Sequence, residues 1–165
     1  MIQDIICPDN IAILKTDSSY SIVSLKKFKK GDIIFKNTSI VFNTNIVKEI
    51  KVNMKVLYKN IFQNFHNPID ETIKLDYLVH TVNNGNGMRE YYSYDSFSNH
   101  SCDPNAEMIT TDKYITGSDY KIVANKDIEY MEEITQDYET FDTMLDGTTF
   151  NCRCNSNCCR KIIRG

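Results

Sequence analysis

The chain has 165 residues, the length of one domain with a single core of ordinary size. Hydrophobic residues make up 41% and charged residues 25%, an ordinary globular composition, and no apolar run approaches the ~20 residues of a membrane-spanning helix. The net charge of −3 argues against a nucleic-acid surface and is compatible with a basic peptide partner.

The N-terminal segment, residues 1–8, has neither the basic region nor the long apolar region of a secretory signal. We therefore expect an intracellular protein, and the sequence does not distinguish the nucleus from the cytoplasm. Thiols in such a compartment are reduced, so a cluster of cysteines favours a metal site over disulfides.

Short strands are expected at 11–14 and 20–25, with a turn at 16–19 between them, and a third strand at 33–35 after a turn at Gly31-Asp32. A similar pattern returns one hundred residues later. Chance similarity between two β-turns explains this echo as well as a repeat does. If the repeat is real, Met131 stands at the position of Gly31, and its turn must avoid a positive φ or tolerate strain. The matched positions are Ser24, Phe28, Gly31, Asp32 and Ile34 with Ala124, Ile128, Met131, Glu132 and Ile134.

The middle of the chain is the segment in which helices are expected. Apolar residues between 46 and 61 recur at helical spacing, although Val52 and Val56 leave a strand possible. Residues 70–82 form a clearer helical stripe that starts with two acidic residues and ends at the Asn- and Gly-rich run 83–87. The remainder, 107–111, 120–124 and 133–137, is expected to form short strands.

Two later segments carry chemistry-bearing side chains. Residues 97–105, Phe-Ser-Asn-His-Ser-Cys-Asp-Pro-Asn, are poor helix material and predict a tight loop that directs polar groups inward. Near the C-terminus, Cys152, Cys154 and Cys159 form Cys-x-Cys-x4-Cys, which supplies three of the four ligands of tetrahedral zinc. Cys158 is a local candidate for the fourth, although adjacent cysteines rarely both bind one ion comfortably. A loose, reduced tail is the alternative.

With the stretch 132–138, Glu-Glu-Ile-Thr-Gln-Asp-Tyr, these segments resemble the SET-domain protein lysine methyltransferases with a post-SET zinc motif. The resemblance runs from about residue 11 to 160. It implies a mostly β (α+β) fold, β-clip-like, of small sheets with short inserted helices and a pseudoknot that passes the C-terminal segment beneath an earlier loop. It assigns 1–148 to the SET domain, with a variable insert at about 44–90, and 149–165 to a zinc-binding post-SET flap.

The resemblance also implies the reaction and its ligands. It implies that S-adenosylmethionine is the methyl donor and that a lysine-containing protein or peptide, a histone tail or a non-histone protein, is the substrate. The charge and the lack of a long apolar run, and not the resemblance, are the reasons why no nucleic-acid site and no membrane partner are expected. Tyr138 corresponds to the catalytic tyrosine, and Asn99 and His100 to cofactor contacts. Phe150 is placed to stack on adenine or to pack, and Cys102 becomes the fourth zinc ligand. The plain structural interpretations are a buried strand tyrosine and a hydrogen-bonded loop histidine.

The chain departs from the family pattern at two places. Ser19-Tyr20-Ser21 stands where the family has a Gly-x-Gly that approaches the cofactor, and a Cβ there narrows the approach. Gln136 stands where the family commonly has Phe or Tyr, so the number of methyl groups transferred is not readable. These departures also fit an alternative function, a catalytically degenerate SET-fold module that binds a protein partner. One tyrosine of the group Tyr91, Tyr92 and Tyr94 is expected to line the substrate channel.

Overall fold

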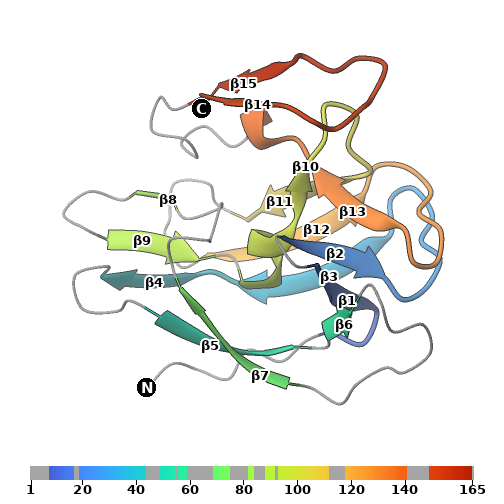
Figure 1. Ribbon diagram of the computed structural model, residues 1–165. Helices are drawn as coiled ribbons and strands as arrows, with labels where there is room; N and C mark the ends of the chain where they lie inside the picture. Colours follow the sequence, from blue (N-terminus) through green and yellow to red (C-terminus); the bar gives the residue numbers. More distant parts are fainter. Residues whose placement is uncertain are drawn as a thin grey trace.

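The computed structural model describes residues 8–16, 19–43, 49–54, 56–58, 69–74, 82–83, 88–91, 93–111, 118–140 and 149–164, and every structural statement below concerns these residues. The described part of the chain is built mainly from short strands in several small sheets, with the C-terminal hairpin at the top of Figure 1. None of its helices has the length and hydropathy that a bilayer crossing requires.

The elements in chain order are as follows. The strands are β1 (Ile11–Lys15), β2 (Tyr20–Ser24), β3 (Ile33–Thr38), β4 (Ile40–Asn43), β5 (Glu49–Met54), β6 (Val56–Tyr58), β7 (Ile69–Lys74), β8 (Val82–Asn83), β9 (Met88–Tyr91), β10 (Asn99–His100), β11 (Ala106–Thr110), β12 (Asp119–Ala124), β13 (Glu133–Gln136), β14 (Thr149–Asn151) and β15 (Ile162–Arg164). The described residues also contain two 3-10 helices. The first, η2 (Ser93–Phe97), precedes β10, and the second, η3 (Tyr138–Thr140), follows β13.

The main core joins two of the sheets. One has the strand order β10-β13-β2-β1-β6 and the other the order β11-β12-β3. Their apolar side chains meet with the aromatic residues of η2 in one cluster, in which Ile11, Ile22, Ile122 and Tyr94 are fully buried. The alternation of apolar and polar residues in these strands provides a buried face, as strand geometry requires. The strands expected in these regions are confirmed.

Strand β13 connects segments that lie far apart in the sequence. It pairs antiparallel with β2 and parallel with β10, so that Asn99 lies opposite Thr135 and His100 opposite Gln136. The backbone N–H of Ser101 extends this contact by donating to the carbonyl of Gln136 at 2.9 Å. The polar loop 97–105 and the stretch 132–138 are thereby held side by side.

Where the structure describes the middle of the chain, the helix expected at 70–82 is wrong, and between 46 and 61 the strand alternative, which Val52 and Val56 left possible, is what forms. Strand β5 pairs antiparallel with β7, so residues 70–74 are extended, and β6 pairs with β1. The register places Ile50 opposite Ile73 and Met54 opposite Ile69. This matches a period of two in Ile50-x-Val52-x-Met54, the strand alternative to the helical spacing, because a short apolar pattern fits both periods. The rest of the expected helices, 46–48, 55, 59–61 and 75–81, lies outside the described residues.

The echo between residues 24–34 and 124–134 is a structural repeat. Phe28 and Ile128 exchange backbone hydrogen bonds of 2.9 Å in each direction. The N–H of Gly31 donates to the carbonyl of Ala124, and the N–H of Met131 donates to the carbonyl of Ser24, at 2.7 and 2.8 Å. Each turn is also closed by its own acidic side chain, since Asp32 accepts from the N–H of Lys29 and Glu132 from that of Glu129, both at 2.8 Å.

Met131 adopts the conformation of the glycine that it replaces. Its φ is +65°, against +93° for Gly31, and its side chain is 42% exposed. A left-handed conformation costs an L-residue roughly 1–2 kcal/mol, and an exposed side chain recovers little of it by packing. The second turn therefore tolerates strain instead of avoiding a positive φ.

Met131→Gly is expected to raise the free energy of unfolding by about 1 kcal/mol, because glycine relieves this strain. The reverse change in the symmetric turn, Gly31→Met, is expected to lower it by at least as much. No described atom lies within 4 Å of a Cβ built on Gly31, so this second cost is conformational and not a steric clash. Urea unfolding of the two variants measures both effects, and a Met131→Gly protein no more stable than the parent contradicts the expectation.

Candidate active site and metal centre

The loop 97–105 is fixed to β13 by one asparagine. The amide nitrogen of Asn105 donates to the carbonyl of Glu133 at 2.9 Å and to Oε1 of Glu132 at 3.0 Å, and its amide oxygen accepts the N–H of Thr135 at 2.9 Å. Asn105 is 7% exposed, so these bonds form away from water, where leaving such groups unpaired is costly. Asn105 therefore fixes the position of the loop relative to β13.

Tyr138 follows β13 and points back into the loop. Its hydroxyl donates to the carbonyl of Ser98 at 2.7 Å, and its side chain is 4% exposed. Burial, with the nearby charges of Asp95 and Glu133, raises the pKa of this phenol above its ordinary value. The hydroxyl is consequently neutral and its direction is fixed by the carbonyl that it contacts.

His100 has a defined tautomer. The backbone N–H of Tyr138 donates to Nδ1 of His100 at 3.1 Å, so the ring proton lies on Nε2. Nε2 is 3.3 Å from Sγ of Cys102. Burial lowers the pKa of the imidazole, and the neutral ring donates from Nε2 to the sulfur. His100 therefore connects the tyrosine at one side of the loop with a cysteine at the other.

Three aromatic rings gather at this point. The ring centroids of His100 and Tyr138 are 5.2 Å apart, and the ring of Phe150 lies 5.9 Å from both. Phe150 belongs to β14 of the tail and is partly buried. The edge-to-face and tilted arrangements are those that aromatic pairs prefer. Packing of Phe150, one of the two roles expected for it, is thus observed.

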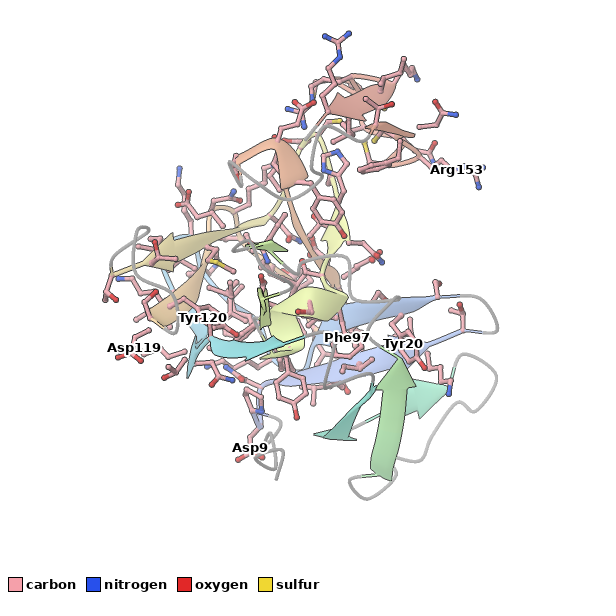
Figure 2. All side chains as sticks on the ribbon, turned by 90° about the vertical axis from the view of Figure 1, so that its left-hand side faces the viewer. Asp9, Tyr20, Phe97, Asp119, Tyr120 and Arg153 are labelled. Carbon is pink, nitrogen blue, oxygen red and sulfur yellow. The ribbon has the colours of Figure 1, made fainter. Side chains whose placement is uncertain are left out.

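Of the residues expected to bind the cofactor, Asn99 and Tyr20 are in contact, whereas Ser19 lies in an exposed turn. The amide nitrogen of Asn99 donates to the carbonyl of Tyr20 at 3.1 Å and to Oε1 of Glu133 at 2.7 Å. The ring of Tyr20 packs edge-on against Phe97 at 5.5 Å, and the two lie side by side in Figure 2. Ser19 is exposed in the turn before β2, where its hydroxyl is 2.7 Å from that of Thr16.

Ser21 and the tyrosines before the loop complete the set of expected site residues. Ser21 is buried in β2 opposite Leu14. Tyr94 is fully buried in the core. Tyr92 and the side chain of Tyr91 lie outside the described residues, so the tyrosine that lines the channel is not identified.

Four cysteines converge as one cluster. The sulfur atoms of Cys102, Cys152, Cys154 and Cys159 all lie within 4.8 Å of one another. Those of Cys102 and Cys152 are 3.7 Å apart, close to the ~3.8 Å that tetrahedral ligands at 2.3 Å would show. Backbone N–H groups of Arg160 and Cys102 point at Sγ of Cys102 and Cys154, at 3.3 and 3.5 Å. Cys158 is exposed and stays outside the cluster.

The pKa values of two of these thiols diverge. Hydrogen bonding from the Ser156 hydroxyl is the main factor that lowers the pKa of Cys154, to about 5. Burial raises the pKa of Cys152 to about 12. The hydrogen bonds therefore favour the thiolate at Cys154, whereas burial favours the thiol at Cys152.

An ion pair that the sequence did not indicate also holds the tail. The guanidinium of Arg160 donates to both carboxylate oxygens of Asp137, at 2.8 and 2.5 Å, and Nε lies 3.2 Å from Glu139. Burial opposes ionisation of Asp137, but the bonds from Arg160 and from the Glu139 N–H outweigh it and lower the pKa of that carboxyl. Asp137 precedes Tyr138, so the bidentate pair fixes the tail next to the tyrosine.

The second residue that sequence reasoning missed is Asp95 in η2. It is completely buried and accepts a hydrogen bond from the amide nitrogen of Gln136. Its only sequence signal is an acidic residue among aromatic residues, in Tyr-Asp-Ser-Phe, which is too weak to separate it from an exposed loop aspartate. Its position beneath the site appears only when η2 packs against β13.

Two comparisons with known proteins give a match, one to a family model and one to a solved structure. A family model of the SET domain matches residues 19–139. A search of solved structures finds the crystal structure of a Plasmodium falciparum protein described as a candidate histone methyltransferase. That protein is 18% identical, with 80% of this chain and 95% of the other covered at a TM-score of 0.47. No curated protein sequence matches this chain.

The matched range contains β10, β13 and Tyr138, the elements that assemble the site, and it spans well over half of the chain. The small sheets and the pairing of β13 with both β2 and β10 agree with the mostly β fold expected from the resemblance. The chain therefore belongs to the SET-domain family, the family of protein lysine methyltransferases.

Proposed function

We propose that this chain transfers methyl groups from S-adenosylmethionine to the side-chain amine of lysine in a protein or peptide, a histone tail or a non-histone protein. The observation that carries the proposal is the position of Tyr138. Its hydroxyl is fixed on the Ser98 carbonyl, directly beside Asn99 and His100, in an interior site. A reduced cysteine cluster supports an intracellular location for the reaction.

The chemistry requires a dry and well-aligned site. In methyl transfer the amine lone pair attacks the methyl carbon as the carbon–sulfur bond breaks, and no covalent enzyme intermediate is needed. Lysine must arrive neutral although its ordinary pKa is ~10.4, and burial favours the neutral form. The fixed hydroxyl of Tyr138 and the Ser98 carbonyl orient the amine. Alignment of this kind can supply ~7–11 kcal/mol of the barrier reduction.

The residues present fit the cofactor. Both N–H groups of the Asn99 amide are used by Tyr20 and Glu133, which leaves the amide oxygen and the Glu133 carboxylate as acceptors for the cationic end of a ligand. Phe150 is partly exposed beside His100 and offers an aromatic face to a base. Ser19 precedes β2 and Ser21 lies in it, on either side of the Tyr20 carbonyl that accepts from Asn99. When bound, S-adenosylmethionine supplies the methyl group on a sulfonium.

The cysteine cluster fits zinc. Its sulfur spacing matches a tetrahedral site, and the amide N–H groups directed at the sulfurs stabilise thiolates. Cys102, Cys152, Cys154 and Cys159 would hold the ion, which would join the tail to the central loop. Zinc here would contribute to folding and to the position of Phe150 and not to the reaction itself.

Tyr138→Phe is expected to lower the rate of methyl transfer at least ~100-fold while calorimetric binding of S-adenosylmethionine changes less than threefold, because only the hydroxyl is lost. Transfer is measured from methyl-labelled cofactor to core histones and to a cell lysate. Tyr120→Phe is the matched control, a buried tyrosine that packs on Phe35 in the other sheet. Absence of heat with the cofactor at high micromolar concentration, together with no transfer, would support the binding-module alternative.

Cys159→Ser is expected to release zinc and to lower the melting temperature, because it removes one of four ligands. Cys158→Ser, a change of the neighbouring thiol that lies outside the cluster, is expected to do neither. Elemental analysis of both purified variants measures the metal content. Equal zinc loss in the two variants, or full retention in Cys159→Ser, would refute the assigned ligand set.

A further inference from the structure

A pair of buried polar side chains lies beneath the proposed active site. Asp95 is completely buried and Gln136 is 1% exposed. The amide nitrogen of Gln136 donates to Oδ1 of Asp95, and within the described residues Oδ2 of Asp95 and Oε1 of Gln136 have no hydrogen-bond partner. A protein interior rarely leaves such oxygens unpaired, since each costs ~1–3 kcal/mol. Two unpaired acceptors on one bonded pair require an explanation.

Both members of the pair are linked to Tyr138, Gln136 through β13 and Asp95 through the chain that follows η2. Gln136 is two residues before Tyr138 and lies opposite His100 in the register. Asp95 is three residues before Ser98, whose N–H donates to the Asp95 carbonyl at 2.9 Å and whose own carbonyl accepts the Tyr138 hydroxyl. The charge of Asp95 also contributes to the raised pKa of Tyr138. The carboxylate therefore belongs to the same interior site.

The missing partner has a defined chemistry. Both unpaired atoms are acceptors and one carries negative charge, so their complement is a cation with several N–H donors. A lysine ammonium has three donors and no acceptor. Among the described residues no lysine, arginine or histidine is a cause of the pKa shift of Asp95, so no described side chain supplies this cation. Burial raises that pKa to about 7, although the Gln136 bond opposes it, which suits a proton acceptor at neutral pH.

We propose that Asp95 accepts the proton of the substrate lysine and that Oε1 of Gln136 accepts a remaining N–H of the amine. The proposal rests on the proposed methyl transfer and supplies its proton acceptor. The Nζ–H bond of the ammonium breaks and an O–H bond forms at Oδ2, so a cation and an anion become a neutral amine and a neutral acid. The freed lone pair then attacks the methyl carbon, and Asp95 returns its proton to water before the next turnover.

The rate of methyl transfer tests the proposal across pH 6 to 9, with core histones or a lysate as acceptor. The parent rate is expected to rise with pH through a midpoint near 7 and then level off, because Asp95 must be ionised. Asp95→Asn keeps the shape and can pair with the Gln136 amide, yet should be at least ~100-fold slower near pH 7. Its rate should climb about tenfold per pH unit, following the neutral fraction of lysine.

The control is Asp119→Asn, the same change at an exposed aspartate that accepts from Thr38 at the start of β12. A second measurement needs no turnover: carbon-13 spectra of aspartate-labelled protein should show one carboxyl that titrates near 7 and disappears in Asp95→Asn. Equal rates and pH profiles in Asp95→Asn and the control would overturn the proposal while methyl transfer stands. If the parent protein binds the cofactor but transfers no methyl group, the proposed function is wrong. If every aspartate carboxyl titrates below ~5, only the role of Asp95 as proton acceptor is wrong.

Discussion

The site depends on one contact between distant segments, the parallel pairing of β10 with β13. This pairing is only two residues long, and it is stabilised by the Asn105 amide and by the Tyr138 hydroxyl on the Ser98 carbonyl. Because β13 also pairs with β2, Asn99 and Tyr138 are both positioned by the same sheet. Catalytic geometry of this kind tolerates errors of only ~0.5 Å, so a strand that is paired along both of its edges suits the task.

The tail is coupled to this contact in two ways. Arg160 binds the carboxylate of Asp137, the residue before Tyr138, while His100 donates to the sulfur of Cys102 in the cysteine cluster and accepts from the backbone of Tyr138. A metal ion bound at Cys102 would therefore affect the position of Tyr138 through the imidazole of His100. The ion pair joins the tail to Asp137 after β13, and the thiol cluster joins it to Cys102 of the loop, so the tail is held at two separate segments.

Much of the site could be predicted from the sequence, because its residue types are chemically restrictive. The loop around Asn99 and the spacing of Cys152 and Cys154 allow few alternatives, and Cys102 was found where the resemblance placed it. The middle segment could not be predicted in the same way. A short apolar pattern such as that around Ile50 fits both a helix and a strand, and only the pairing of β5 with β7 decides between them. Asp95 was missed because burial of a lone carboxyl is a tertiary property.

The internal repeat contains backbone strain at one position, the left-handed Met131. Two turns related by hydrogen-bond exchange join the two halves of the core, and the left-handed backbone at Met131 lies in the turn whose N–H donates to the carbonyl of Ser24. The central claim, that this interior site methylates lysine, is tested most directly by mass spectrometry. After incubation of the zinc-loaded chain with methyl-deuterated S-adenosylmethionine and a cell lysate, deuterated methyl groups on lysine are predicted. Bound cofactor without deuterium on any lysine would contradict the account.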